Sequence, residues 1–288
     1  MSRLTHLVGL ITLLQTTLLV SLTTPSFADT LGSIKESKVL RLAVREDAPP
    51  FSSKNADGRY VGYSVALCQA IANALKKQLS IADLKIEYVP VTASDRFDIM
   101  TGHKADILCE ATSATLTRRE AIDFSIPTFV SGTGLVIREG GPMDMKSLTG
   151  KKLGVLGGTT AEEALRRTLK DQKISATIVP AVSHEEGMSA LEKQEVEAYF
   201  ADRTILQYWL ATRNSPQKFL LAEEYLTIEP YALGLPGNDP TFRLAVDREL
   251  SRMYRSGGVI KLFRGAFGEK AKPTNLLKAL YTISGLPE

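Results

Sequence analysis

The sequence ADILCEATSATLTRREAIDFSIP, from Ala105 to Pro127, joins a short apolar strand to a hydroxyl-rich segment and a basic residue. After the strand, Ala105 to Leu108, come Thr112, Ser113, Thr115, Thr117 and Arg118. An arginine guanidinium can bind a carboxylate through two parallel hydrogen bonds. We therefore predict a carboxylate-binding site here. The alternative is that Thr117 and Glu120 form a capping box at a helix start while Arg118 is solvated.

This stretch resembles the bacterial solute-binding proteins that serve polar amino-acid ABC transporters. The resemblance is carried by the strand, the alternating hydroxyl residues, the arginine and the Asp123-Phe124-Ser125 run, and it extends over Leu31 to Gly268. It implies that Ser113 and Arg118 hold the α-carboxylate of a ligand. Ala111 replaces the usual serine, so only its backbone carbonyl is expected to accept from the ligand's α-amino group.

The first 28 residues are typical of a secretory signal peptide. Arg3 precedes an almost unbroken apolar run from Leu7 to Val20, and Ser26-Phe27-Ala28 is a small-x-small cleavage site. We expect cleavage after Ala28 and a periplasmic mature protein. No later stretch predicts a membrane span of ~20 apolar residues.

Composition excludes several classes of protein. The 288 residues carry 35 Lys and Arg against 32 Asp and Glu, a net charge of +3, with no basic run. Nucleic-acid binding is therefore not expected, and no motif indicates a cofactor or metal. We expect a monomer.

The only two cysteines, Cys68 and Cys109, permit one disulfide, but a single pair is no scaffold signature. We predict two buried free thiols.

Two arginines stand where ligands bind in α/β proteins, just beyond the carboxyl ends of strands. Arg45 ends the predicted strand Val39 to Val44, and Arg96 follows the strand Lys85 to Val91. Either could instead be a solvated surface residue. In the resembling family, basic-amino-acid binders look acidic at the position of Arg45, and glutamate/aspartate binders carry an arginine at that of Arg96. Both residues therefore favour an acidic ligand side chain.

Three further residues lie in the second half of the predicted site. Thr160 follows Gly157-Gly158 and, with Glu163, predicts a capping box at a helix N-terminus, a structure that binds anions. The resemblance implies that Thr160 approaches the α-carboxylate, that His184 faces the ligand side chain, and that Asp202 pairs with the ligand ammonium. The alternatives are a core or capping role for His184 and a helix N-cap at Asp202.

Alternating strands and helices predict an α/β protein with mainly parallel sheets. The resemblance implies a two-lobed, type II periplasmic-binding-protein fold. Lobe 1 would comprise residues 29–132 plus 233–288 and lobe 2 residues 133–232. Two crossover strands, near Phe129–Gly134 and Thr227–Leu233, would form the hinge.

The predicted function is capture of glutamate or aspartate for delivery to an ABC permease in the inner membrane. Arg118, Ser113 and Thr160 would hold the α-carboxylate, and Asp202 with the Ala111 carbonyl would hold the ammonium. Arg45, Arg96 and His184 would compensate the side-chain carboxylate. One alternative is an exported enzyme resembling cyclohexadienyl dehydratase, with Glu110 or His184 as the acid. Another is a ligand-sensing module for a membrane receptor.

Overall fold

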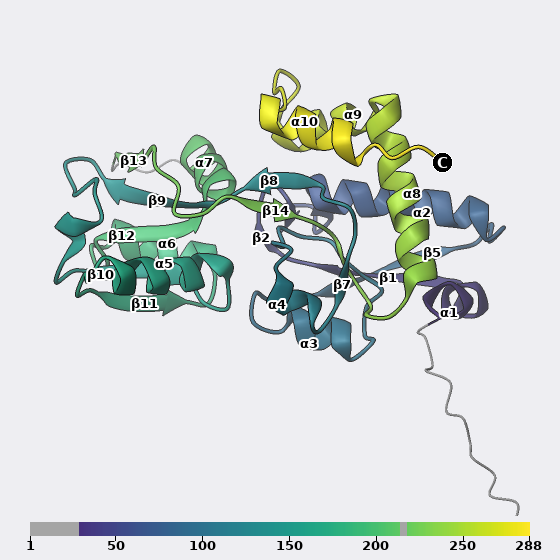
Figure 1. Ribbon diagram of the computed structural model, residues 1–288, viewed down its shortest axis with the longest axis horizontal. Coiled ribbons are helices and arrows are strands. Elements are labelled where there is room, and N and C mark those ends of the chain that lie inside the picture. The colour runs from purple at the N-terminus through teal and green to yellow at the C-terminus, as the bar shows by residue number, and fades with distance from the viewer. Residues whose placement is uncertain (1–28, 214–217) are drawn as a thin grey trace, which may run out of the picture.

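The computed structural model describes residues 29–213 and 218–288, and the predicted signal peptide lies outside them. Figure 1 shows two bodies side by side, each a five-stranded sheet with helices packed on it. The α/β class is confirmed. Within the described ranges, no helix is both long and apolar enough to cross a membrane.

The first sheet has the strand order β5-β1-β6-β15-β7. Its members are β1 (Val39–Val44), β5 (Lys85–Pro90), β6 (Ile107–Leu108), β7 (Asp123–Phe124) and β15 (Gly234–Leu235). The strands β5, β1 and β6 are parallel, whereas β15 runs antiparallel to both β6 and β7. The strand predicted from Val39 to Val44 is confirmed. A separate small sheet contains β2 (Asp47–Ala48), β3 (Ser52–Lys54) and β4 (Tyr60–Val61).

Helices cover both faces of the first sheet. The larger core contains buried apolar residues of β1, α2, α8, α9 and α10, and a smaller core unites Met100 of α3 with Leu108 and Phe124. These elements and the remaining helices of this body are α1 (Thr30–Ser37), α2 (Tyr63–Gln78), α3 (Arg96–Thr101), α4 (Leu116–Arg119), α8 (Pro240–Ser256), α9 (Gly258–Phe267) and α10 (Asn275–Ser284).

The second sheet repeats this plan with the order β11-β10-β12-β9-β13. Its members are β9 (Thr133–Arg138), β10 (Lys152–Leu156), β11 (Thr177–Ala181), β12 (Ala198–Asp202) and β13 (Phe219–Leu221). The strands β11, β10 and β12 are parallel, and β9 is antiparallel to β12 and β13. In each sheet, therefore, four strands run in one direction and a single strand, β15 in the first sheet and β9 in the second, runs antiparallel to them.

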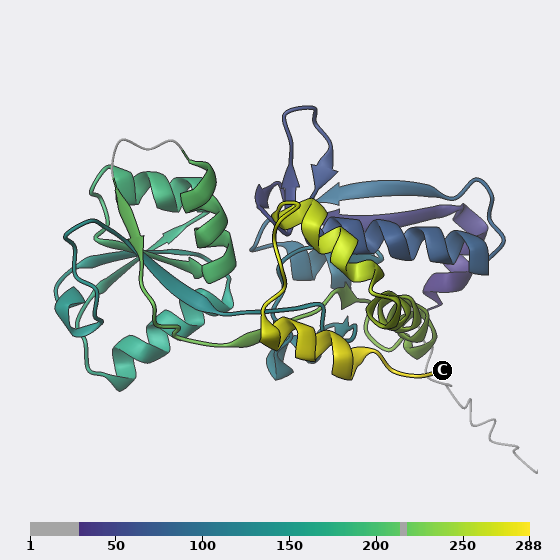
Figure 2. The same ribbon diagram turned by 90° about the horizontal axis from the view of Figure 1, so that it is seen from above.

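The second sheet is the middle layer of three (Figure 2). Leu165 of α5 (Thr160–Asp171) belongs to one core, while α6 (His184–Glu192) and α7 (Arg203–Thr212) contribute to another. A short 3₁₀ turn, η1 (Lys146–Leu148), adds Leu148 to the first of these cores.

Two antiparallel strands run between the bodies, β8 (Phe129–Ser131) and β14 (Glu229–Tyr231). Gly132 follows β8 at a close approach to the second segment. A Cβ at this position would lie 1.8 Å from the Thr227 carbonyl oxygen, so the crossing requires glycine. We propose the predicted boundaries, residues 29–132 plus 233–288 and 133–232, as the division into lobes.

The prediction for the cysteines is wrong. Cys68 in α2 and Cys109, next to the end of β6, form a disulfide bond across 41 residues of sequence. Both residues are fully buried. Because α2 packs on the first sheet, this bond fixes the helix to the loop that leaves β6.

Candidate functional site

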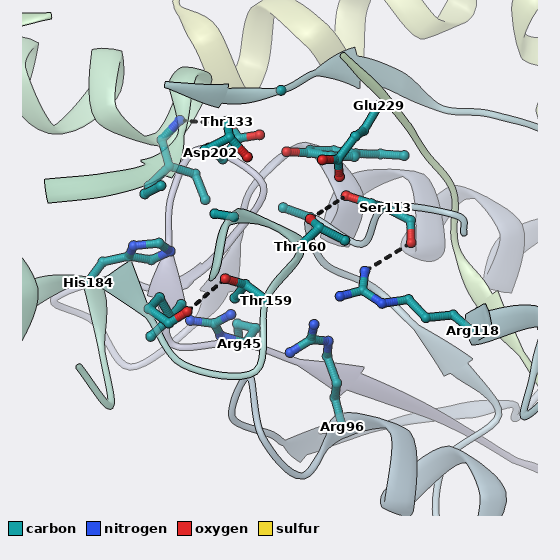
Figure 3. Close-up of a pocket in the computed structure, with 17 residues that line it drawn as sticks. Arg45, Arg96, Ser113, Arg118, Thr133, Thr159, Thr160, His184, Asp202 and Glu229 are labelled. Carbon is teal, nitrogen blue, oxygen red and sulfur yellow. Dashed lines mark hydrogen bonds between the residues drawn. The ribbon is translucent and has the colours of Figure 1, made fainter. Parts of the chain in front are cut away.

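One pocket is lined by all eight residues that the sequence predicted as ligand contacts, drawn together in Figure 3. They are Arg45, Arg96, Ala111, Ser113, Arg118, Thr160, His184 and Asp202. These residues follow or end parallel strands of the two sheets, because the carboxyl ends of both sets of strands point toward the space between the bodies. The cavity volume is about 40 Å³, and one buried water needs ~10–15 Å³. It suits a small polar molecule.

Charges in the pocket are separated by sign. In Figure 3 the guanidinium groups of Arg45, Arg96 and Arg118 lie on one side, and the carboxylates of Asp202 and Glu229 lie on the other. The hydroxyls of Ser113 and Thr160 lie between the two groups. Such a pocket matches a molecule with an anionic end and a cationic end.

Arg118 is the cation whose guanidinium is least engaged with protein carboxylates. It donates to the Ser113 carbonyl oxygen at 3.0 Å and lies over the Phe97 ring, and within residues 29–213 and 218–288 it forms no ion pair. Burial lowers its pKa, opposed by the nearby carboxylate of Glu110. A ligand carboxylate would relieve that desolvation by supplying the missing counter-charge.

Thr160 is available to the pocket because its neighbour caps the helix. The sequence predicted Thr160 as the capping residue, but the hydroxyl of Thr159 accepts from the Glu162 N–H and serves as the N-cap of α5. The Thr160 hydroxyl instead lies 3.2 Å from that of Ser113. Helix α4 likewise has Thr115 as its N-cap, and not Thr117 as in the alternative interpretation of this segment.

Asp202 serves as a helix cap and also faces the pocket. Its Oδ1 accepts from the backbone N–H groups of Thr204 and Ile205 at 2.8 and 3.1 Å. Its Oδ2 is buried and accepts no hydrogen bond from the described residues. Burial raises the Asp202 pKa to about 7, partly offset by the nearby Ser131 hydroxyl and by the N–H groups at the helix start. An unpartnered buried carboxylate oxygen favours a cationic donor such as an ammonium group.

Sequence reasoning missed a second acid beside Asp202. Glu229 of β14 lines the pocket, and its Oε1 accepts from the Thr227 hydroxyl at 2.6 Å. Glu229 also raises the pKa of Asp202. Its signal in the sequence was its place in the predicted crossover strand, where it precedes Pro230.

The two arginines predicted to await a ligand carboxylate already have protein partners. Arg45 donates through Nε and Nη2 to Asp47 Oδ1, at 2.8 and 2.5 Å. Arg96 Nε lies 2.9 Å from Glu110 Oε1, and Arg45 Nη1 lies 3.5 Å from Glu110 Oε2. Burial lowers the Arg96 pKa to about 10, so Arg96 stays protonated at neutral pH. Both cations are therefore already paired with carboxylates of the protein.

His184 stays uncharged in this site. Burial, with Arg45 next, lowers its pKa to about 3, although Asp47 opposes the shift. Its Nδ1 lies 3.0 Å from the Tyr199 hydroxyl, and its backbone N–H donates to Asp47 Oδ2 at 3.3 Å. His184 can hydrogen-bond a ligand but does not add positive charge.

Apart from the connecting segments, three hydrogen bonds between described residues join the two bodies around the pocket. They are the Ser113–Thr160 hydroxyl pair, the Asp47–His184 hydrogen bond, and the Arg96 Nη2 donation to the Gly158 carbonyl at 3.3 Å. Gly158 has φ +71°, and a Cβ there would lie 3.3 Å from the Ala93 carbonyl oxygen, so glycine allows this approach. The structure therefore represents a closed arrangement.

The fold and this pocket define a two-bodied solute-binding protein. Residues 40–269 match the family model of bacterial extracellular solute-binding proteins, family 3. The chain belongs to this family, and the type II fold predicted from its sequence is confirmed by its structural neighbours.

One sequence relative and two solved structures illustrate what this chain is similar to. The chain is 30% identical to the glutamate/aspartate import solute-binding protein of Salmonella typhimurium, covering 88% of this chain and 84% of that one. A crystal structure of the solute receptors for L-cysteine of Neisseria gonorrhoeae matches with a TM-score of 0.74 and 27% identity, covering 85% and 98% of the two chains. The ancestral amino acid-binding protein AncCDT-1, described as a precursor of cyclohexadienyl dehydratase, matches with a TM-score of 0.73 and 25% identity, covering 83% and 100%.

Proposed function

We propose that this protein captures an amino acid in the pocket between its two bodies. Arg118, with the Ser113 and Thr160 hydroxyls, would hold the α-carboxylate. Asp202 and the Ala111 carbonyl would hold the α-ammonium. The observation that carries this proposal is that one pocket contains both Arg118, which has no carboxylate partner among the described residues, and an Asp202 oxygen without a hydrogen-bond partner. Arginine and carboxylate are the charge-assisted partners that a zwitterion requires.

For the ligand side chain we propose that of glutamate, aspartate or their amides, with its polar end toward Arg45, Arg96 and His184. The name of the Salmonella typhimurium relative supports this class. All three residues line the pocket. The two arginines present donors to an oxygen-bearing group, and neutral His184 can add a hydrogen bond.

Delivery to an ABC permease completes the proposed role. The name of the Salmonella typhimurium relative includes import, and the family consists of extracellular proteins. We propose a periplasmic monomer that closes on its ligand through a hinge motion of β8 and β14. The three contacts between the bodies would form on closure and break on release.

A thermal-shift screen of the mature protein, refolded to remove bound ligand, tests this function. The screen covers the twenty amino acids and simple dicarboxylates. A ligand at ~100 times its Kd stabilises the folded state by roughly 2.7 kcal/mol, which raises the melting midpoint. Stabilisation by glutamate, aspartate or their amides is expected. Stabilisation only by dicarboxylates without an α-amino group would overturn the assignment of Asp202.

An enzymatic function on the same fold is a second candidate, favoured by the similarity to the dehydratase precursor. The geometry opposes it, because Glu110 is ion-paired to two arginines and His184 is held neutral at pH 7. Neither group is free to act as a general acid toward a substrate. Incubation with prephenate or arogenate should give no aromatic product, and formation of one would establish the enzyme.

A further inference from the structure

Glu110 is a buried carboxylate behind the wall of the pocket. It follows β6 and is 1% exposed, and its own carbonyl oxygen accepts from the Ser64 hydroxyl at 2.9 Å. The Thr112 hydroxyl donates to its Oε1. The adjacent Cys109 is bonded to Cys68 of α2. The backbone that carries Glu110 is thus held from two sides, so this carboxylate has a defined position.

The carboxylate of Glu110 interacts with both arginines of the proposed side-chain subsite. Oε1 lies 2.9 Å from Arg96 Nε, and Oε2 lies 3.5 Å from Arg45 Nη1. All three side chains are at most 5% exposed. Ion pairs so far from solvent are screened little by water or salt.

Each of the two arginines also donates to other protein groups through part of its guanidinium. Arg96 donates through Nη1 to the Ala93 carbonyl and through Nη2 to the Gly158 carbonyl. Arg45 donates through Nε and Nη2 to Asp47. The two arginine charges are therefore matched by two carboxylates, those of Glu110 and Asp47. This end of the pocket is neutral before any ligand enters.

We propose that Glu110 is a specificity-determining positioning residue: an internal carboxylate that takes the counter-charge role a ligand's side-chain carboxylate would otherwise play. An acidic side chain would then add a third negative charge beside two cations. An amide side chain adds none and can bond to arginine through its carbonyl oxygen. This inference rests on the proposed function and refines it, since it assigns the site to the amides, glutamine or asparagine, over the corresponding acids.

Glutamate and aspartate are disfavoured relative to their amides by their charge and not by their size. Glutamine and glutamate, and likewise asparagine and aspartate, are almost equal in volume. Any difference in affinity within a pair therefore reports the charge of the distal subsite. Placing an uncompensated carboxylate in an enclosed site is costly. The negative charge of Glu110 therefore disfavours a ligand whose side chain is also negatively charged.

The test measures Kd by calorimetry for both acid and amide pairs, using wild-type protein and Glu110→Gln. The variant keeps the shape of the side chain and removes its charge. Asp106→Asn is the matched control, because Asp106 is also buried beside β6, and its partner is Arg41, which is not a pocket residue. Wild type and control are expected to bind the amide roughly tenfold or more tightly than the acid. Glu110→Gln should shift this ratio toward the acid by a similar factor.

Each outcome decides the inference. A purely structural role for Glu110 would weaken both ligands equally and leave their ratio unchanged, which overturns the proposal. Tighter wild-type binding of the acid also overturns it while leaving amino-acid capture intact. If Glu110→Gln does not fold, the wild-type ratio alone decides. If no amino acid binds wild type, the proposed function itself fails.

Discussion

Arg118→Ala should remove binding of every amino acid, whatever its side chain. The guanidinium would supply the counter-charge for the α-carboxylate, a group that all amino acids share. Among the described residues, Arg118 has no carboxylate partner. Its removal therefore frees no protein group that could bind the ligand in its place. Removing one partner of a buried, hydrogen-bonded charge pair costs ~2–5 kcal/mol. This corresponds to a roughly 30- to 5,000-fold rise in Kd.

The assay is isothermal calorimetry on refolded protein with the best ligand from the thermal-shift screen. Arg119→Ala is the control, because Arg119 is adjacent in α4 and carries the same charge but is exposed. The control should bind with wild-type affinity and show that helix α4 tolerates the loss of one cation. Binding by Arg118→Ala within a factor of about three of wild type would refute the carboxylate clamp, since that is below 1 kcal/mol.

Three further predictions concern Asp202, Thr160 at the start of α5, and the disulfide bond. Burial raises the Asp202 pKa to about 7, and only the ionised carboxylate attracts an ammonium group. The affinity for the ligand should therefore fall about tenfold per pH unit below pH 7 and level off above it. Calorimetry showing constant affinity between about pH 5 and pH 9 would contradict this. Thr160→Val should weaken binding by ~1.5–3 kcal/mol through one lost hydrogen bond to a carboxylate, measured against Thr168→Val on the same helix, and equal affinities for the two variants would exclude Thr160 as a contact. Replacing Cys68 and Cys109 together by alanine should cost roughly 4 kcal/mol of unfolding free energy, from the chain entropy of a loop of 41 residues, and an unchanged urea midpoint would show that this bond is not stabilising.

The fold was predictable because its signals are local and repeated. The apolar run Val39–Val44 gives a strand. The predicted apolar face of Leu67, Ile71, Ala74 and Leu75 gives helix α2, in which Ala74 is half-buried and the other three are buried. The antiparallel partners were harder to foresee. The strands β7 and β15 have two residues each, which is too short for any periodic pattern.

The predicted site residues were found one at a time, yet all line one pocket. This could be anticipated because the carboxyl ends of parallel strands share one edge of a sheet. The exact capping residues could not. Thr159 and Thr160 are chemically the same, and only the backbone angle at the helix start decides which of them caps the helix and which one faces the pocket.

The cysteine prediction failed for a physical reason. Cys68 lies within a helix and Cys109 beside a strand end, and no spacing in the sequence links them. Their sulfurs meet only because α2 packs against the first sheet, a tertiary fact. The sequence permitted a bond between Cys68 and Cys109, but it gave no distance between them and so could not decide between a disulfide and two free thiols.

Glu110 shows why a count of charges along the sequence can mislead about a ligand. Arg45 and Arg96 were predicted as ligand-binding residues because they follow strands. Two cations in a pocket predict an anionic ligand. That inference holds only if no carboxylate of the chain reaches the same cations first. Glu110 does reach both of them, since it leaves a neighbouring strand with a side chain long enough to lie between them. The same two arginines can therefore favour an acid or its amide, and a single buried carboxylate decides which.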